Sequence, residues 1–183
     1  MTPEQIVDGA IEHGAIQDRQ ELLQLVMLLI ERKVDSVIEV GTYRGGTLHA
    51  WCQIAKGMIV SIDYGDVPRS DFLTWHDPAL LWTPKMYSQD PSLPGLLEKL
   101  NPGGYDFLFI DGGHSKEDAE RDYRNLSPLV KKGGVIAFHD TTLIPICPDE
   151  AYNVRTFWNE IKQGREYLEL DSGVNMGIGV LID

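Results

Sequence analysis

Acidic side chains, in one case joined by a histidine, stand at the ends of five short apolar runs in this sequence. They are Glu39, Asp63, Asp90, Asp111 and the pair His139-Asp140. In an open parallel sheet, ligands bind outside the carboxyl ends of the strands. If each run is a strand, all these side chains gather at one edge, and the sequence predicts a reaction site there.

Two of these carboxylates, Asp111 and Asp140, could share a divalent metal ion. They would end neighbouring strands, and two carboxylates in a partly closed site repel each other unless a cation or proton lies between them. A bound metal can hold a hydroxyl group and lower its pKa. A histidine nearby, such as His114, can then take the proton. An ordinary role at the start of a helix is the alternative for His114.

The elements that must position these side chains begin with Val34 to Thr47, VDSVIEVGTYRGGT. An apolar run leads into a loop with three glycines, and a helical pattern follows. Strand, glycine loop and helix form the nucleoside-binding start of many open α/β sheets. Asp63 closes the next apolar run, where a carboxylate can bind both hydroxyls of a ribose. A plain strand–turn–helix, with glycines that serve only the turn, is the alternative.

The glycine loop separates two classes of ligand. A dinucleotide fingerprint, G-x-G-x-x-G, needs glycine where this chain has Tyr43, and Glu39 would direct a negative charge at a pyrophosphate. A carboxylate at that place suits a cationic amine. The loop resembles motif I of the class I S-adenosylmethionine-dependent methyltransferases, whose pattern is acid-x-Gly-x-x-x-Gly. The resemblance implies an S-adenosylmethionine site made by Glu39, Gly41, Thr42, Tyr43, Gly45, Asp63, Tyr64, Asp90 and Asp111.

Within that site the resemblance implies distinct roles for three acids. Glu39 is expected at the amino end of the cofactor, Asp63 at the ribose, and Asp90 at the adenine. The match at Asp90 rests only on its position after the third expected strand.

A second resemblance covers Ile110-Asp111-Gly112-Gly113-His114 and Ala137-Phe138-His139-Asp140-Thr141. It is similar to a subgroup that includes metal-dependent sugar and macrolide O-methyltransferases and cephalosporin hydroxylase-like proteins. The resemblance implies a divalent metal, Mg²⁺ or Mn²⁺, held by Asp111, His139 and Asp140. His114, three residues after Asp111, would lie near the same site and is our candidate for the catalytic base.

This chain departs from the subgroup at His139, where Glu or Asp is usual. Mg²⁺ prefers oxygen ligands, whereas imidazole suits softer metals. Three interpretations therefore stay open. His139 binds a softer metal, or it points away and leaves Mg²⁺ to Asp111 and Asp140, or no metal binds.

The order of the predicted elements gives the fold. We expect a Rossmann-like α/β fold whose seven-stranded, mostly parallel sheet has an antiparallel last strand and helices on both faces. It forms one domain, residues 1–183, with N-terminal helices in 1–33, a cofactor-binding core in 34–140, and a C-terminal helix with closing strands in 141–183. The third strand is expected near residues 85–88, and the C-terminal helix near 151–162.

The irregular stretch from Tyr64 to Pro84 is long for a loop inside a compact domain, which is typical of a functional lid. We expect it to cover the site of the methyl acceptor, with Trp75, His76 or Trp82 in the wall. The alternative is that these aromatic residues only hold the loop down.

Composition excludes some functions. A formal net charge of −12, from 28 acidic and 16 basic residues, disfavours nucleic acid and anionic membranes as partners. The start of the chain lacks a signal-peptide pattern, and the most apolar segment, Leu22 to Ile30, is too short to span a membrane. Cys52 and Cys147 are a weak basis for a disulfide, so a cytoplasmic setting is expected. The apolar face of that segment predicts a helix packed on the sheet, with a homo-oligomer contact as the alternative.

The sequence thus predicts an S-adenosylmethionine-dependent methyltransferase that acts on a hydroxyl of a small molecule or sugar, with divalent-metal assistance. One alternative is a nicotinamide-dependent oxidoreductase, against which Tyr43 and Glu39 argue. The other is a non-catalytic cofactor-binding protein of the same fold. Fold alone does not decide between them.

Overall fold

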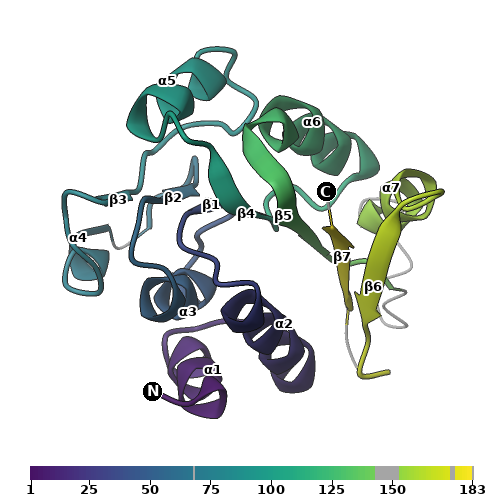
Figure 1. Ribbon diagram of the computed structural model, residues 1–183, viewed down its shortest axis with the longest axis horizontal. Helices are drawn as coiled ribbons and strands as arrows, with labels where there is room; N and C mark the ends of the chain where they lie inside the picture. The colour runs from purple at the N-terminus through teal and green to yellow at the C-terminus, as the bar shows by residue number, and fades with distance from the viewer. Residues whose placement is uncertain (68, 143–152, 174–175, 183) are drawn as a thin grey trace.

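A seven-stranded sheet with the order β3-β2-β1-β4-β5-β7-β6 forms the centre of the computed structural model, which describes residues 1–67, 69–142, 153–173 and 176–182 (Figure 1). The parallel pairs involve β1 (Val37–Val40), β2 (Ile59–Ile62), β3 (Leu81–Trp82), β4 (Tyr105–Ile110) and β5 (Val130–His139). The remaining strands, β6 (Glu166–Leu170) and β7 (Ile178–Ile182), pair antiparallel with each other, and β7 pairs antiparallel with β5. This arrangement confirms the predicted fold class.

Helices cover both faces of the sheet (Figure 1). One face carries α1 (Pro3–Glu12), α2 (Arg19–Glu31) and α3 (Gly46–Ile54). The other carries α5 (Leu93–Leu100), α6 (Lys116–Leu126), the short 3₁₀ turn η1 (Ser127–Leu129) and α7 (Val154–Ile161). The four-residue helix α4 (Arg69–Phe72) precedes β3. None of the helices in these described ranges has the length and apolar character that a bilayer crossing requires.

Side chains along a strand point alternately to the two faces of the sheet, and this determines which helices each polar residue faces. In β5, Ala137 belongs to the core under α2 and α3, whereas Phe138 belongs to the core under α6 and α7. Successive side chains of a strand point to opposite faces, so His139 follows Ala137 onto the α2 side. Glu39 in β1 follows Val37 in the same way. The polar residues that end these strands therefore approach the N-terminal helices.

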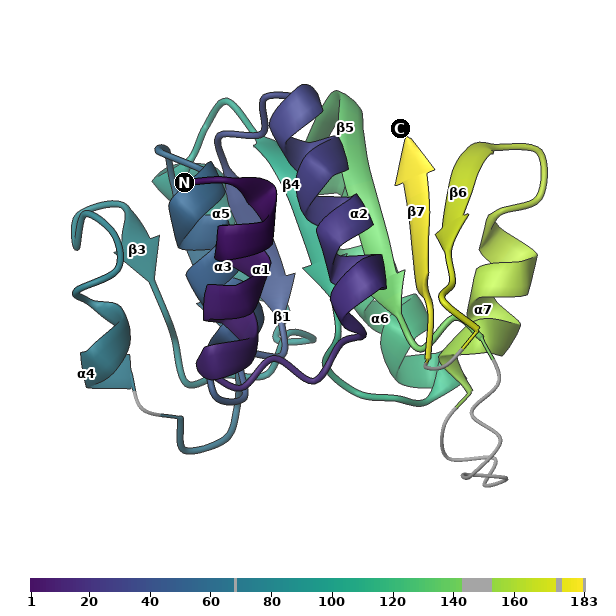
Figure 2. The same cartoon turned by 90° about the horizontal axis from the view of Figure 1, so that it is seen from below.

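The edge that gathers these residues is easiest to see from the side. Figure 2 shows the arrows of β1, β4 and β5 pointing to one edge and that of β7 pointing the opposite way. Helix α2 begins at this edge, where its N-cap Asp18 accepts hydrogen bonds from the main-chain N–H groups of Gln20 and Glu21. Such a cap stabilises a helix by about 1 kcal/mol. It also brings the first turn of α2, with Glu21, and the preceding Gln17 against the end of the sheet.

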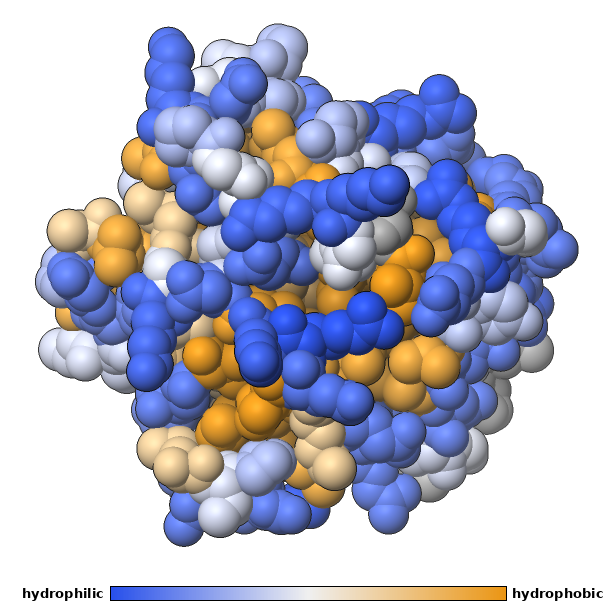
Figure 3. All heavy atoms as spheres, viewed as in Figure 1, coloured by the Kyte–Doolittle hydropathy of each residue, from blue (hydrophilic) through white to orange (hydrophobic). Residues whose placement is uncertain are grey.

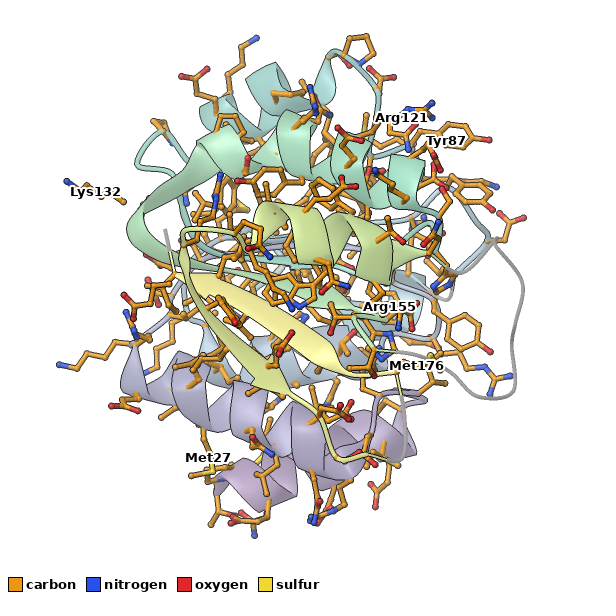
Figure 4. All side chains as sticks on the ribbon, turned by 90° about the vertical axis from the view of Figure 1, so that its right-hand side faces the viewer. Met27, Tyr87, Arg121, Lys132, Arg155 and Met176 are labelled. Atoms are coloured by element: carbon orange, nitrogen blue, oxygen red, sulfur yellow. The ribbon has the colours of Figure 1, made fainter. Side chains whose placement is uncertain are left out.

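The apolar face of α2 serves the core of its own chain. Leu22, Val26 and Leu29 are fully buried, as the packed-helix prediction requires. Ile30 and Met27 are exposed instead, and Figure 4 shows Met27 on the outer side of the helix, away from the sheet. On the face drawn in Figure 3, hydrophilic side chains run across the apolar areas.

Two boundaries differ from the prediction. The third strand is Leu81–Trp82, and Lys85 makes only an isolated parallel bridge to Asp63. A strand of two residues has no periodicity from which it could be recognised. Helix α7 begins at Val154, later than expected, while residues 143–152, which include Cys147 and most of the expected proline-rich loop, lie outside the described residues.

Candidate functional site

A cavity of about 780 Å³ opens at the carboxyl edge of the sheet. Five short segments and the first turns of α6 provide its described lining. They are residues 14–17, the β1–α3 loop, residues 62–65 after β2, residues 86–89, residues 111–114 after β4, and Asp118 with Asp122 of α6. The lining includes Gly41, Thr42, Tyr43, Asp63, Tyr64, Asp111 and His114 among the predicted site residues.

Asp63 connects the end of β2 to the glycine loop. Its Oδ2 accepts hydrogen bonds from the main-chain N–H groups of Thr42 (3.0 Å) and Tyr43 (2.9 Å), and its Oδ1 accepts one from Gly65 (2.7 Å). A carboxylate has about four acceptor positions, so these three bonds leave about one position for a hydroxyl group of a ligand. Asp63 therefore fixes the loop as well as lining the cavity.

Glu39 lies behind the cavity wall and is fully buried. Its Oε1 accepts a hydrogen bond from Trp51 Nε1 (2.6 Å), and its other oxygen accepts one from the Ser61 hydroxyl. Ser61 Oγ in turn lies 2.7 Å from Thr42 Oγ1 in the loop. Burial raises the pKa of Glu39 to about 7, against the hydrogen bonds from Ser61, Thr47 and Trp51, which lower it. The carboxylate thus supports the loop from inside.

Gly45 and Asp90 also lie outside the cavity lining. Gly45 has a φ of +85°, and a Cβ added to it would lie 2.5 Å from Cε1 of Phe72. Asp90 accepts hydrogen bonds from the main-chain N–H and the hydroxyl of Ser92 at the start of α5. In its place Tyr87, Ser88 and Gln89 line the cavity.

Two tyrosines stand at the rim of the cavity. The rings of Tyr64 and Tyr87 are stacked, with centroids 4.9 Å apart, and both side chains are exposed. Figure 4 shows Tyr87 projecting from the surface beside α6. The two rings pack on each other, and their outer faces offer an aromatic surface for a planar ligand group at the mouth of the cavity.

The aromatic residues of the expected lid hold their segment to the scaffold. Trp75 contacts the rings of His13 and His49 edge-on, at centroid distances of 4.8 and 5.2 Å. The Nε2 atom of His76 lies 3.0 Å from the carbonyl oxygen of Gly57, and Trp82 packs on the core under α5. None of these three residues is in the cavity lining among the described residues. These contacts support the alternative, that the aromatic residues hold the loop down, and a wall role toward the methyl acceptor stays a prediction.

The two acids and the histidine that were expected at a metal do come together. His139 Nδ1 lies 3.0 Å from Asp111 Oδ1 and 3.3 Å from Asp140 Oδ1. One donor atom from each of the three residues lies within 4.8 Å of the others. His139 and Asp140 are buried, and Asp140 adopts the left-handed φ of +62° just after β5 ends. Asp140 also reaches His114, whose Nδ1 lies 2.5 Å from Asp140 Oδ2.

The electrostatics of this cluster favour positive charge. Burial alone would lower the pKa of His139, but the charges of Asp111 and Asp140 raise it to about 9. The hydrogen bond that His114 makes to the Asp140 carboxylate raises the pKa of His114 as well. The Oδ1 atom of Asp140 is buried and has no hydrogen-bond partner among the described residues. One imidazole nitrogen and two carboxylate oxygens around a common point are a donor set that fits a divalent metal ion.

Three residues that the sequence did not single out belong to the site. Gln17 donates from Nε2 to Asp111 Oδ2 (2.6 Å), and Glu21 is fully buried at the start of α2. Asp122 in α6 is buried at the cavity, where burial raises its pKa to about 6 and the Ser88 hydroxyl donates to its Oδ1. Asp122 could have been noticed, because it lies between the inward-facing Ala119 and Leu126 at helical spacing. For Gln17, the sequence offers no comparable pattern that would have marked it as a site residue.

Residues 38–141 match the family described as "Methyltransferase domain", and this segment covers more than half of the chain. The chain belongs to this family. The match includes the glycine loop and both acid–histidine motifs, and it confirms the resemblance to methyltransferases on which the prediction was built.

Proteins of known sequence and structure agree with the family match. An uncharacterized protein of Acanthamoeba polyphaga mimivirus is 30% identical over 111 residues, which are 56% of this chain and 50% of that protein. The structure of a candidate caffeoyl-CoA O-methyltransferase from Staphylococcus aureus aligns with a TM-score of 0.74 at 17% identity, over 100% of this chain and 92% of that one.

MycE, a methyltransferase of mycinamycin biosynthesis solved with Mg, SAH and mycinamycin VI, aligns with a TM-score of 0.67 at 15% identity, over 98% of this chain and 54% of that one. The chain thus spans about half the length of the mimivirus protein and of MycE. At these identities the solved structures establish the shared fold.

Proposed function

We propose that the protein transfers a methyl group from S-adenosylmethionine to a hydroxyl group of a small molecule or sugar. The observation that carries the proposal is one cavity that has Asp63 at one side and Asp111 with His114 at another. The first residue suits a ribose, and the other two suit a reacting hydroxyl. MycE, which shares the fold, was solved with SAH, the product that S-adenosylmethionine leaves after it has given up its methyl group.

In this proposal the glycine loop holds the cofactor. Gly41, Thr42 and Tyr43 approach it with their main chain, Asp63 accepts from its ribose, and Tyr64 packs on it. Asp111 lies at the methyl end. Ser88 and Gln89 take the adenine-binding role that the sequence gave to Asp90, because they line the cavity. Glu39 and Gly45 contribute indirectly, Glu39 through Ser61 and Thr42, and Gly45 through the shape of the loop.

Methyl transfer from a sulfonium is an in-line displacement, in which the carbon–sulfur bond breaks as the carbon–oxygen bond forms. The protein contributes mostly by placing the two reactants in line. The acceptor hydroxyl must lose its proton, and we assign that proton to His114. His114 lines the cavity, and Asp140 orients its ring through Nδ1. Asp140 also favours the positive charge that His114 gains.

Asp111, His139 and Asp140 would hold the divalent metal of this proposal. Such an ion would bind the acceptor hydroxyl and lower its pKa. In the chain itself, the proposal is supported by the buried Asp140 Oδ1, which has no hydrogen-bond partner in the part that the structure describes, and by the convergence of three donor atoms. On the side of the comparisons, the structure of MycE contains Mg.

For the methyl acceptor, we propose a chemical class and not a particular compound. The strongly negative net charge disfavours a nucleic acid or an anionic membrane, and the scarcity of cysteine suits a cytoplasmic setting. A homo-oligomer of the chain would have to use exposed apolar residues such as Met27 and Ile30, because the inner face of α2 is buried.

Three measurements test the function. Calorimetry with S-adenosylmethionine, SAH and a nicotinamide dinucleotide should show binding of the first two only. Native mass spectrometry and a transfer assay on a panel of sugars and hydroxylated small molecules, with Mn²⁺ or Mg²⁺ present, should reveal an acceptor. Binding of the dinucleotide in place of SAH would overturn the proposal, and SAH binding without transfer to any hydroxyl would favour a non-catalytic binding protein.

A further inference from the structure

Asp111, His139 and Asp140 form the acid–histidine cluster, and each has two polar side-chain atoms. In both aspartates, one of these atoms is bound by a neighbouring side chain. Asp111 turns Oδ1 toward the cluster, while Gln17 Nε2 donates to its Oδ2 at 2.6 Å. Asp140 turns Oδ1 toward the cluster, while its Oδ2 lies 2.5 Å from His114 Nδ1. The same division would be expected for the third residue, His139.

His139 turns Nδ1 toward the two carboxylates, so Nε2 is the atom that needs a neighbour. That atom is buried and has no hydrogen-bond partner among the described residues. An unpaired buried polar group costs about 1–3 kcal/mol, so a ring placed this way needs a reason. The reason must come from the α2 side of the sheet, which His139 faces.

Glu21 on α2 has a matching unpaired atom. Its side chain is fully buried, and its Oε2 has no hydrogen-bond partner in the described part of the chain. Its Oε1 is fixed by Ser172, whose main-chain N–H and hydroxyl lie at 2.9 and 2.8 Å. One oxygen of this carboxylate is therefore anchored, and the other remains available inside the protein.

The sheet brings the two unpaired atoms into one region. His139 pairs with Ile178 of β7, and Ile178 pairs with Leu170 of β6, so the three residues form one row across the sheet. Ser172, to which Glu21 is bound, follows two residues after Leu170. The views of Figures 1 and 2 agree that α2 passes over this side of the sheet.

We propose that Glu21 is the positioning residue of His139, and that its Oε2 accepts a hydrogen bond from Nε2–H when a metal ion is bound. The proton is thereby kept on Nε2, and Nδ1 is presented as a neutral nitrogen ligand between Asp111 and Asp140. A carboxylate on the far nitrogen of a metal-binding histidine fixes the tautomer and the ring orientation. The inference rests on the proposed metal site and deepens it.

The inference also predicts which metal ion the site prefers. A neutral imidazole and two carboxylates suit a first-row transition-metal ion that accepts both oxygen and nitrogen ligands, such as Mn²⁺, whereas Mg²⁺ prefers a set made only of oxygen. Gln17, His114 and Glu21 together then orient all three ligands from outside. This chain should therefore prefer Mn²⁺ over Mg²⁺, and the preference should depend on His139 and Glu21.

The decisive variant is Glu21→Gln, because it keeps the size of the side chain. The amide oxygen can still accept from Ser172, so a merely structural role would survive. The amide NH₂ of Gln would instead face Nε2 of His139 and favour the tautomer that carries its proton on Nδ1. A protonated Nδ1 cannot bind a metal. Glu31→Gln, at the exposed last residue of the same helix, is the matched control.

The test uses the whole chain, stripped of metal with EDTA and titrated with Mn²⁺ while the paramagnetic resonance signal of free Mn²⁺ is followed. Competition with Mg²⁺ gives the preference. We expect Glu21→Gln to lower the Mn²⁺ affinity by roughly 10–100-fold, the usual effect of losing such an outer partner. The control should bind as the native protein does. Nitrogen-15 NMR of the histidines should show the His139 proton on Nε2 in the native metal complex.

A second variant, His139→Glu, restores an all-oxygen set and should shift the preference toward Mg²⁺. Native Mn²⁺ affinity in Glu21→Gln, or a native protein that prefers Mg²⁺, would overturn the inference. Calorimetry with SAH on the same samples separates it from the proposed function. Normal SAH binding without any Mn²⁺ binding would overturn the inference and leave the methyltransferase intact, whereas loss of SAH binding in the native protein would contradict the function itself.

Discussion

The Nδ1 atom of His114 lies 2.5 Å from Oδ2 of Asp140, although the two residues are separated by a whole helix and strand. The other oxygen of Asp140 faces His139. A single carboxylate thus connects the proposed base to the proposed metal ligands. Changing this carboxylate should disturb both, and it should leave the proposed cofactor-binding loop, to which it makes no hydrogen bond among the described residues, in place.

Replacing Asp140 by Asn should abolish most of the turnover. Asn tolerates the left-handed φ of +62° at this position, so the backbone should stay in place. Loss of an oriented base lowers rates by about 10²–10⁴-fold, and loss of a metal ligand adds to this. Steady-state kinetics on the identified acceptor and calorimetry with S-adenosylmethionine should show lost turnover with near-native affinity. EDTA should have the same effect on the native protein. Full activity of Asp140→Asn in EDTA would mean an enzyme that works without metal.

Replacing Asp63 by Asn should weaken cofactor binding. The variant loses a charged acceptor, and its NH₂ group would oppose the main-chain donors of Thr42, Tyr43 or Gly65. Loss of a hydrogen bond to a charged group costs about 1.5–3 kcal/mol, which corresponds to roughly 10–100-fold in affinity. Calorimetry measures this directly. Asp66→Asn, at a neighbouring exposed acid, is the control, and equal affinities in both variants would rule out the assignment of Asp63.

Glu39→Gln should change how stability depends on pH. The pKa of Glu39 is about 7 in the folded protein and near its ordinary 4.5 in the unfolded chain. The folded state therefore gains stability from protonated Glu39 below pH 4.5, and this gain is lost as the pH rises through 7. The loss amounts to at most about 3 kcal/mol. Urea unfolding of both proteins at several pH values should show that the native protein loses stability relative to Glu39→Gln between these limits. A constant difference across that range would mean that Glu39 titrates normally.

Trp75→Ala should destabilise the protein and loosen the glycine loop. Trp75 and Phe72 pack against Gly45, and Trp75 also contacts His13 and His49. Removing a large aromatic side chain from such a place costs about 3–5 kcal/mol when it is fully buried, and less for a partly exposed one. Hydrogen exchange should show residues 69–82 protected in the protein without ligands and loosened in the variant. If protection of this segment instead arises only with cofactor and acceptor, the segment is a lid after all.

The sequence was sufficient for the fold and for the residues at strand ends, because both depend on local patterns. Asp111 and Asp140 were expected to converge, and parallel neighbouring strands make that unavoidable. Glu39 shows where this reasoning stops, since a position at a strand end does not say whether a side chain faces the cavity or the core. Asp90 lies outside the cavity lining, and the strand before it has only two residues, too few for the sequence to show where that strand ends.

Gln17 and Glu21 could not be predicted at all. Their partners, Asp111 and Ser172, lie 94 and 151 positions away in the chain. No local pattern marks a glutamine or a buried glutamate for such contacts. They are determined by where α2 lies on the sheet, which is a property of the packed structure.

The packing of α2 has a consequence for the segment that matches the methyltransferase family. That segment, residues 38–141, holds the glycine loop and both acid–histidine motifs, yet Gln17 and Glu21 precede it. If residues 38–141 were transplanted into another protein, the three proposed ligands would move without Gln17, which donates to Asp111, and without Glu21, the proposed partner of His139. The side of the sheet that Leu22, Val26 and Leu29 cover would meet water. The segment that this site needs is therefore longer than the segment that matches the family, because it includes the start of α2. Chimaeras that take only residues 38–141 should fold poorly.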